Sequence, residues 1–174
     1  MYHADVLDLL KTDLTAKIQI HVGGAYGNKE KSIKRFIRRF KILPAKIKKR
    51  LVIENDDRIY TVNDCVSIHR ETGIPVVFDT LHHRCNSGGE TMLNAFSGAH
   101  ATWKVKDGLP IVDYSVQDST KKKGAHALSI QTRNFKYFIN QIEGFDFDIM
   151  CEIKDKEKSA LKAAGILGRM RLPG

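Results

Sequence analysis

The stretch IPVVFDTLHH, residues 74–83, decides the fold. Its first half is a short apolar run of β-branched and aromatic residues, which is typical of a strand buried on both faces. Asp79 follows this run, and His82 comes three residues later. A carboxylate and an imidazole that leave a strand end together can bind one divalent metal ion, such as Zn²⁺, Mn²⁺ or Fe²⁺. The alternative is that Asp79 caps the next helix and that the histidines lie on the surface.

Strand and helix patterns alternate on both sides of this stretch. The predicted strands are residues 17–22, 51–54, 74–78, 110–115 and 147–154. The predicted helices are residues 1–14, a basic helix that ends near Pro44, and residues 63–72, 91–103, 135–142 and 156–167. Such alternation is typical of parallel βα units. The sequence therefore predicts an α/β fold with a parallel sheet.

Every predicted strand ends in an ionisable residue. These are His21, Glu54, Asp79 with His82, Asp113 and Glu152, at intervals of 33, 25, 34 and 39 residues. In a (β/α)₈ barrel the carboxyl ends of the strands converge on one rim, and that rim carries the active site. Acids buried so close together repel one another unless a cation neutralises them. The set indicates more than one metal ion, and His126 adds an imidazole from the loop after the fourth strand.

The composition is that of a globular protein. A chain of 174 residues is long enough for one domain with a sizeable core and short for two. It contains no apolar run of about 18 residues and begins with no signal-peptide pattern, which argues against a membrane partner. The three cysteines have no C-x-x-C spacing, so we expect reduced thiols in the cytoplasm.

The positive charge is concentrated in one segment. The formal net charge is +9, and residues 29–50 carry eleven Lys or Arg residues against one acid. A concentrated basic patch is expected of a protein that binds polyanions. The same segment has apolar residues at helical spacing, so the alternative is the solvated outer face of an amphipathic helix.

Five motifs together point to one family. They are HVGGAYGNKE (residues 21–30), ENDD (54–57), VFD (77–79) followed by HH (82–83), KGAHA (123–127), and DIM (148–150) with Glu152 and Lys154. The chain resembles the UV damage endonucleases over nearly its whole length. That resemblance implies a (β/α)₈ TIM barrel that holds several divalent ions, commonly Mn²⁺, with Zn²⁺ or Mg²⁺ as alternatives. It also implies incision of damaged double-stranded DNA on the 5′ side of ultraviolet photoproducts.

The resemblance assigns roles to individual residues. Matching positions imply metal ligands at His21, Glu54, Asp79, His82, His126 and Glu152. The chemistry that the resemblance implies is metal-assisted phosphodiester hydrolysis. Glu54 and Glu152 are candidates for catalytic ligands shared between ions, and Lys154 is expected to pair with Glu152 or with a phosphate.

Two departures separate the chain from the family pattern. The fourth strand of the family usually ends in Lys-x-His, whereas this chain has Ile111 and Asp113 at those positions. Asp113 can still ligate a metal, but Ile111 cannot replace the lysine. Family members also begin with about three further βα units. We therefore expect residues 1–174 to form one incomplete barrel domain with about five of eight units, which needs an N-terminal partner or self-association.

Residues outside the metal set are candidates for DNA contacts. Lys121, Lys122 and Lys123 form a loop just before His126 that could contact the DNA backbone, or that is simply a solvated loop. Tyr26 lies at the same rim and could stack on a displaced base, or serve only in packing. A sugar isomerase or epimerase on a related barrel explains the ligands but not the basic segments. A non-catalytic remnant that binds metal or DNA is the remaining alternative.

Overall fold

The computed structural model describes residues 2–170 of the chain. Within that range five parallel strands form one sheet in the order β1-β2-β3-β4-β5. The strands are β1 (Ile18–His21), β2 (Leu51–Glu54), β3 (Val76–Asp79), β4 (Ile111–Tyr114) and β5 (Asp148–Cys151). Each strand lies beside the next one in the chain, which is the arrangement that consecutive βα units produce. The predicted α/β class with a parallel sheet is confirmed.

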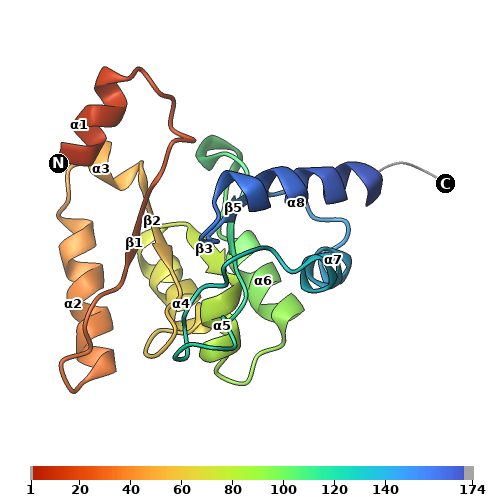
Figure 1. The fold of residues 1–174 in the computed structure, drawn as a ribbon. Helices are drawn as coiled ribbons and strands as arrows, with labels where there is room; N and C mark the ends of the chain where they lie inside the picture. Colours follow the sequence, from red (N-terminus) through yellow and green to blue (C-terminus); the bar gives the residue numbers. More distant parts are fainter. Residues whose placement is uncertain (1, 171–174) are drawn as a thin grey trace.

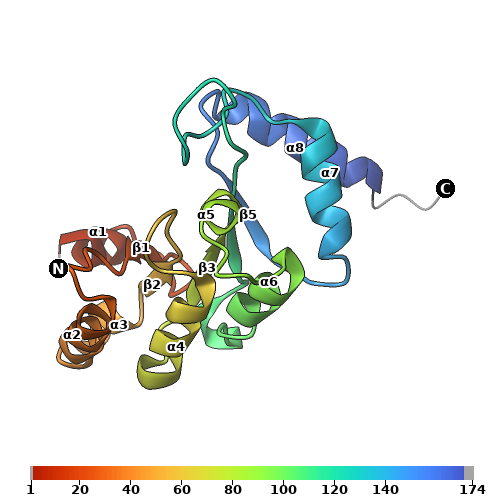
Figure 2. The same cartoon turned by 90° about the horizontal axis from the view of Figure 1, so that it is seen from below.

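Eight α-helices accompany the sheet in the described residues. They are α1 (Tyr2–Leu9), α2 (Lys29–Lys41), α3 (Ala45–Lys48), α4 (Val62–Thr72), α5 (Thr80–Cys85), α6 (Met92–His100), α7 (Thr132–Gln141) and α8 (Glu157–Met170). Figures 1 and 2 show α2, α4 and α6 following one another beside the sheet, while α7 and α8 lie together on the far side of the molecule from α2. A short 3₁₀ turn, η1 (Val105–Asp107), precedes β4.

The helix that leads into β3 shows how local sequence sets the element bounds. Thr61 and Asp64 form a reciprocal capping box at the start of α4. The helix ends at Gly73, whose φ of +73° is in the left-handed region that glycine adopts without strain. The chain then enters β3, all of whose residues are buried.

Alternate residues of the strands face two different environments. Ile53 and Phe78 belong to the main core between the sheet and its helices. Val52 and Val77 point the other way and pack with Trp103 in a second, smaller cluster. Because side chains alternate along a strand, Glu54 and Asp79 share this second face with Val52 and Val77. The ionisable strand ends therefore gather on the face opposite the main core.

One predicted helix is shorter than expected, and two short helices were not predicted. The predicted helix over residues 1–14 ends at Leu9, and residues 80–85 form α5, which was not predicted. The basic segment forms two helices, with Pro44 at the N-cap of α3. Proline has no backbone N–H and its ring fixes φ, so it cannot continue a preceding helix.

Much of the basic segment is engaged within the protein. Ion pairs join Lys29 to Asp64, Lys34 to Glu30, Lys41 to Glu71, and Lys46 to both Asp5 and Asp8. Arg50 is only 4% exposed, and its guanidinium donates to Asp8 and to three backbone carbonyls of residues 12–16. The outer-face interpretation therefore accounts for a large part of this charge.

Along residues 2–170, no helix is both long enough and apolar enough to cross a membrane. Cys65, Cys85 and Cys151 are all free thiols. Cys65 is buried, and this burial raises the pKa of its thiol far above the usual range.

Candidate metal centre

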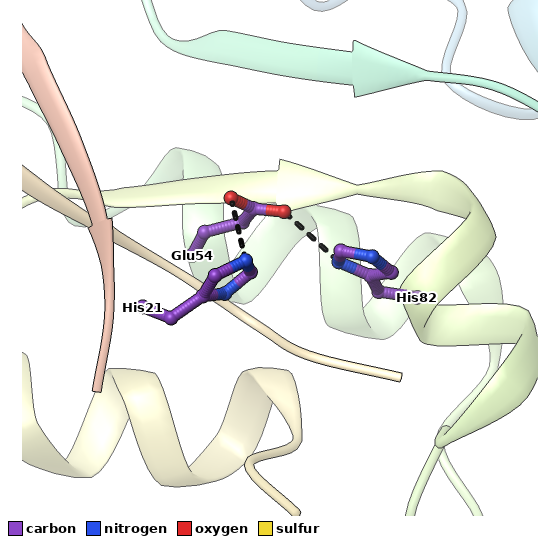
Figure 3. A group of neighbouring side chains, drawn as sticks. All are labelled: His21, Glu54 and His82. Atoms are coloured by element: carbon purple, nitrogen blue, oxygen red, sulfur yellow. Dashed lines mark ion pairs between the residues drawn. The ribbon is translucent and has the colours of Figure 1, made fainter. Parts of the chain in front are cut away.

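Glu54 stands between two histidines at the carboxyl ends of the strands. Its Oε1 lies 2.9 Å from Nδ1 of His82, and its Oε2 lies 3.7 Å from Nε2 of His21 (Figure 3). His21 ends β1, Glu54 ends β2, and His82 comes from α5. One nitrogen or oxygen atom from each of the three lies within 4.8 Å of the others. This spacing allows a single cation to contact all three side chains.

Glu54 also belongs to a second group, which is made of carboxylates alone. Its other members are Asp79 and Asp113, and one oxygen of each lies within 4.8 Å of the others. All three side chains are buried, and Asp79 is inaccessible to solvent. Oδ2 of Asp79 and Oδ1 of Asp113 have no hydrogen-bond partner. Buried carboxylate oxygens without partners are costly, and a bound cation would remove that cost.

Gln19 links the two acids that come from non-adjacent strands. Its Nε2 donates to Oε2 of Glu54 at 2.6 Å and also to Oδ2 of Asp113. Gln19 precedes His21 by two residues, so both side chains lie on the same face of β1. Sequence reasoning missed this residue, although the strand alternation would have placed it there.

Asn55 and the start of helix α5 orient the Asp79–His82 pair. Asn55 donates from Nδ2 to the carbonyl of Asp79 and accepts from its N–H, at 3.1 and 2.9 Å. Asp79 also caps α5 by accepting from the N–H of His82. The helix-cap alternative is thus correct for Asp79, but His82 is only 13% exposed at its side chain and faces Glu54. His83 turns away and packs against Phe78.

Burial disfavours the ionised form of both aspartates in the absence of a cation. Burial raises the pKa of Asp113 to about 8, and the charges of Glu54 and Glu152 act in the same direction. Burial also raises the pKa of Asp79 to about 7, although His82 opposes this shift. The site is therefore an acidic cluster whose members cannot all ionise together without positive charge.

Glu54 and His82, in contrast to the two aspartates, are stabilised in their charged forms. Burial opposes the ionisation of both partners, but the hydrogen bond from His82 and the charge of His21 keep the pKa of Glu54 below its usual value. The hydrogen bond to Glu54 and the charge of Asp79 raise the pKa of His82 to about 9. Glu54 is thus the carboxylate that ionises first among these acids.

His126 and Glu152 form a pair beside the two groups. Nδ1 of His126 lies 2.7 Å from the carbonyl of Glu152 and 3.8 Å from its Oε2. The ring of His126 lies 6.3 Å from that of His82, centroid to centroid. A Nδ1–H bonded to a carbonyl fixes the tautomer that leaves Nε2 free to ligate. These two residues border the cluster but do not belong to either set of three.

Lys154 lies beyond β5 and does not pair with Glu152. Its ammonium lies 3.8 Å from Oδ2 of Asp118. Of the two partners expected for Lys154, Glu152 is not the one that the structure shows, because β5 ends at Cys151 and the chain turns before Lys154. A phosphate as its partner stays a prediction. Lys121, Lys122 and Lys123 are exposed in the loop that precedes His126. Tyr26 is 83% exposed in the loop after β1.

The donor set fits divalent ions. Imidazole and carboxylate together suit Mn²⁺ and Zn²⁺, while a group of three carboxylates suits the harder Mg²⁺ and Mn²⁺. Oδ2 of Asp79 and Oδ1 of Asp113 are buried without a hydrogen bond, although Nδ1 of His82 lies 3.5 Å from the former, and this observation favours a cation. The described residues could thus hold a metal through His21, Glu54, His82, Asp79 and Asp113.

The comparisons with known proteins agree on one family. The family described as UV-endonuclease UvdE matches residues 1–170. The UV DNA damage endonuclease of Clostridium perfringens (strain 13 / Type A) is 42% identical over 168 residues, which are 95% of this chain and 41% of that protein. The enzyme of the same name from Bacillus cereus (strain 03BB102) is 40% identical over 172 residues, which are 98% of this chain and 54% of that protein.

A solved structure shares the fold. The crystal structure of SacUVDE has a TM-score of 0.91 and 48% sequence identity to this chain, and the match covers 97% of this chain and 56% of that one. The chain thus spans about half the length of the curated relatives it matches. The match to the family extends through every strand of the sheet and every residue of the cluster around Glu54. The chain belongs to the UvdE family of UV endonucleases.

Proposed function

We propose that this chain carries the metal-binding part of a DNA repair endonuclease, which cuts the strand on the 5′ side of ultraviolet photoproducts. The proposal rests on the position of Glu54. This residue belongs both to the group with His21 and His82 and to the group of three carboxylates, in a member of the UvdE family. The family assignment disfavours a sugar isomerase or epimerase. The alternative is a non-catalytic remnant, which experiment must distinguish from an active endonuclease.

We assign the ligands by the two groups that Glu54 joins. His21, Glu54 and His82 would hold one ion, Glu54, Asp79 and Asp113 would hold a second, and His126 with Glu152 would complete the centre. Divalent ions, with Mn²⁺ as our first choice, would supply the positive charge that activates water and stabilises the phosphate oxygens. Ile111 offers no donor, so Asp113 is the ligand that β4 contributes.

The protein's own side chains keep this centre in shape. Gln19 fixes the distance between Glu54 and Asp113, and Asn55 fixes the orientation of Asp79. Catalytic arrangements depend on such support because a loosely held ligand loses affinity and rate. We therefore assign Gln19 and Asn55 as positioning residues. Glu152, on the open side of the centre, is our candidate for the acid nearest the DNA.

The loop that carries Lys121, Lys122 and Lys123 is held in place by hydrogen bonds and leads directly to His126. We refer to it as the lysine loop. Gln117 accepts from the N–H of Gly124 and donates to the carbonyl of Lys122, at 2.8 and 3.0 Å. Gln117 also pairs with His126 across an antiparallel bridge. Lys122 and Lys123 line a cavity of about 510 Å³ together with Asp57, Arg58, Cys85 and Asn86. We propose that DNA phosphates bind along this loop.

Replacing Lys122 and Lys123 with alanine is expected to weaken DNA binding and to flatten its salt dependence. Each lost phosphate contact should reduce the slope of log K against log salt by about 0.9. Binding titrations at several salt concentrations measure this slope. The matched control is Arg38→Ala with Lys41→Ala on α2, where Lys41 already pairs with Glu71. An equal effect of both pairs would contradict a specific role for the loop.

The open sheet has a consequence for the isolated 174-residue chain. In residues 2–170, β1 pairs only with β2, and β5 pairs only with β4. Met150, on the inner face of β5, is 58% exposed. Open edges recruit further strands. We propose that residues 1–174 are a partial barrel domain that is completed by strands from elsewhere, either in the same polypeptide or in another.

The isolated chain is therefore expected to self-associate. Light scattering after gel filtration should show species larger than the monomer of 19.7 kDa. Met150→Lys should reduce association because it places a charge on the exposed inner face. Leu161→Lys is the matched control, since Leu161 is 74% exposed and lies on helix α8 rather than on a strand of the sheet. A monodisperse wild-type monomer would refute the open edge as a binding surface.

A plasmid nicking assay tests the proposed function. Irradiated and unirradiated plasmids are incubated with the chain, with Mn²⁺ or with EDTA, alone and together with the remaining length of a UV DNA damage endonuclease. We expect nicks only in irradiated plasmid with metal, and mapping of the new ends should place them 5′ to photoproducts. DNA binding without nicking in every combination would favour the non-catalytic remnant.

A further inference from the structure

An exposed tyrosine at the rim is held in place by an arginine beneath it. Tyr26 is 83% exposed, and the guanidinium carbon of Arg35 lies 4.9 Å from the centre of its ring. This distance is typical of a cation–π contact. We refer to the two side chains as the Tyr26–Arg35 platform. Neither residue belongs to the metal centre.

The loop around Tyr26 is built to hold the ring in this position. Arg35 donates to the carbonyl of Gly24 and to Oγ of Ser32, at 3.2 and 2.9 Å. Ser32 is buried and donates to the carbonyl of Ala25 at 2.8 Å. Hydrogen bonds to residues on both sides of Tyr26 thus hold the Arg35 side chain, so the surface that it presents to the Tyr26 ring is fixed.

The backbone at the platform is strained. Tyr26 has a φ of +49°, which L-residues with large side chains rarely adopt. A Cβ at Gly24 would lie 3.1 Å from Cε2 of Tyr26, so the ring lies directly against the Gly24 backbone. Such strain persists only where the surroundings enforce it, and it clusters at functional sites. A tyrosine that served only to fill space would be buried, whereas this one projects into solvent.

The chemistry of the platform selects its ligand. Arg35 covers the ring from one side, and the high exposure of Tyr26 leaves a flat aromatic surface open to solvent. Lys31, nearby at the start of α2, is exposed and makes no ion pair in the described part of the chain. An exposed aromatic surface matches the planar base of a nucleotide, and Lys31, five residues further along the chain, adds a positive charge that suits its phosphate.

We propose that the Tyr26–Arg35 platform stacks an unpaired nucleobase of the bound DNA strand. The inference rests on the proposed function, because the loop after β1 lies at the same carboxyl-end rim as His21, five residues before Tyr26. The platform holds one base out of the helix at this rim. Stacking needs no particular base, because every base has an aromatic face.

Binding of a short oligothymidine that contains one 2-aminopurine tests the platform without any cleavage. The titration is run in EDTA, and it follows both anisotropy and the quenching of 2-aminopurine on stacking. Tyr26→Ala should weaken binding by about 5- to 150-fold and abolish the quenching. Tyr26→Trp should retain both, since it keeps an aromatic surface. Arg35→Met should give an intermediate loss.

The control and the opposing outcomes are specific. Tyr137→Ala removes a tyrosine that is 60% exposed on α7 and should change nothing. Circular dichroism confirms that each variant folds. Unchanged affinity and quenching in Tyr26→Ala, or no quenching by the wild type, would overturn the platform. Failure of the separate nicking assay with quenching intact would count against the endonuclease function and leave the platform standing.

Discussion

Replacing Glu54 with glutamine is expected to remove bound metal and any incision activity together. Glu54 is the one residue that lies in both ligand groups, so its loss damages both at once. Substitution of residues that merely support a ligand costs about 10- to 100-fold in metal affinity or activity, and a shared ligand should cost at least as much. Elemental analysis of purified protein and calorimetric titration with Mn²⁺ measure the loss.

The matched control is Glu71→Gln on α4. Glu71 is an exposed glutamate that pairs with Lys41, so its replacement removes the same charge from the chain without touching the cluster. Metal content and affinity should match those of the wild type. If Glu54→Gln retained full metal content and affinity, the cluster would not be a metal centre as assigned.

The strand ends could be predicted from sequence because two regularities coincide there. Side chains alternate along each strand, and the carboxyl ends of parallel strands meet on one edge. Residues 51–54 are predicted and observed as a strand with identical bounds. The gathering of His21, Glu54, Asp79 and Asp113 then follows from the order of the strands.

Other features depend on contacts that no local pattern encodes. Gln19 bridges two acids that lie 35 and 94 positions after it in the sequence. A polar residue within a strand has no distinctive sequence signal. Lys154 follows a strand that ends three residues earlier than predicted, so its direction depends on the turn and on Asp118. The contacts of Gln19 and Lys154 join segments that are far apart in the sequence, so only the structure shows them.

Metal affinity is expected to rise steeply with pH because the cation displaces protons from buried carboxyls. Folding raises the pKa of Asp79 to about 7 and that of Asp113 to about 8, whereas an aspartate in an unfolded chain ionises near pH 4. The folded, metal-free protein therefore binds more protons than the unfolded chain between about pH 4 and pH 8. Its stability should fall as pH rises through this window, and His82, with a pKa raised to about 9, adds a loss of the same sign above about pH 6.5.

In the presence of the cation, stability should instead rise with pH, because the cation binds the ionised carboxylates. Each displaced proton should increase the apparent affinity about tenfold per pH unit below the pKa of its group. Calorimetric Mn²⁺ titrations between pH 6 and 8.5, in buffers of different ionisation enthalpy, should show about three protons released near pH 6, one each from Asp79, Asp113 and His82. Asp113→Asn should release one proton fewer, while Asp146→Asn, an exposed residue before β5, should behave as the wild type. A metal affinity that does not change with pH would mean that Asp79 and Asp113 take no part in binding, and that their burial serves the fold alone.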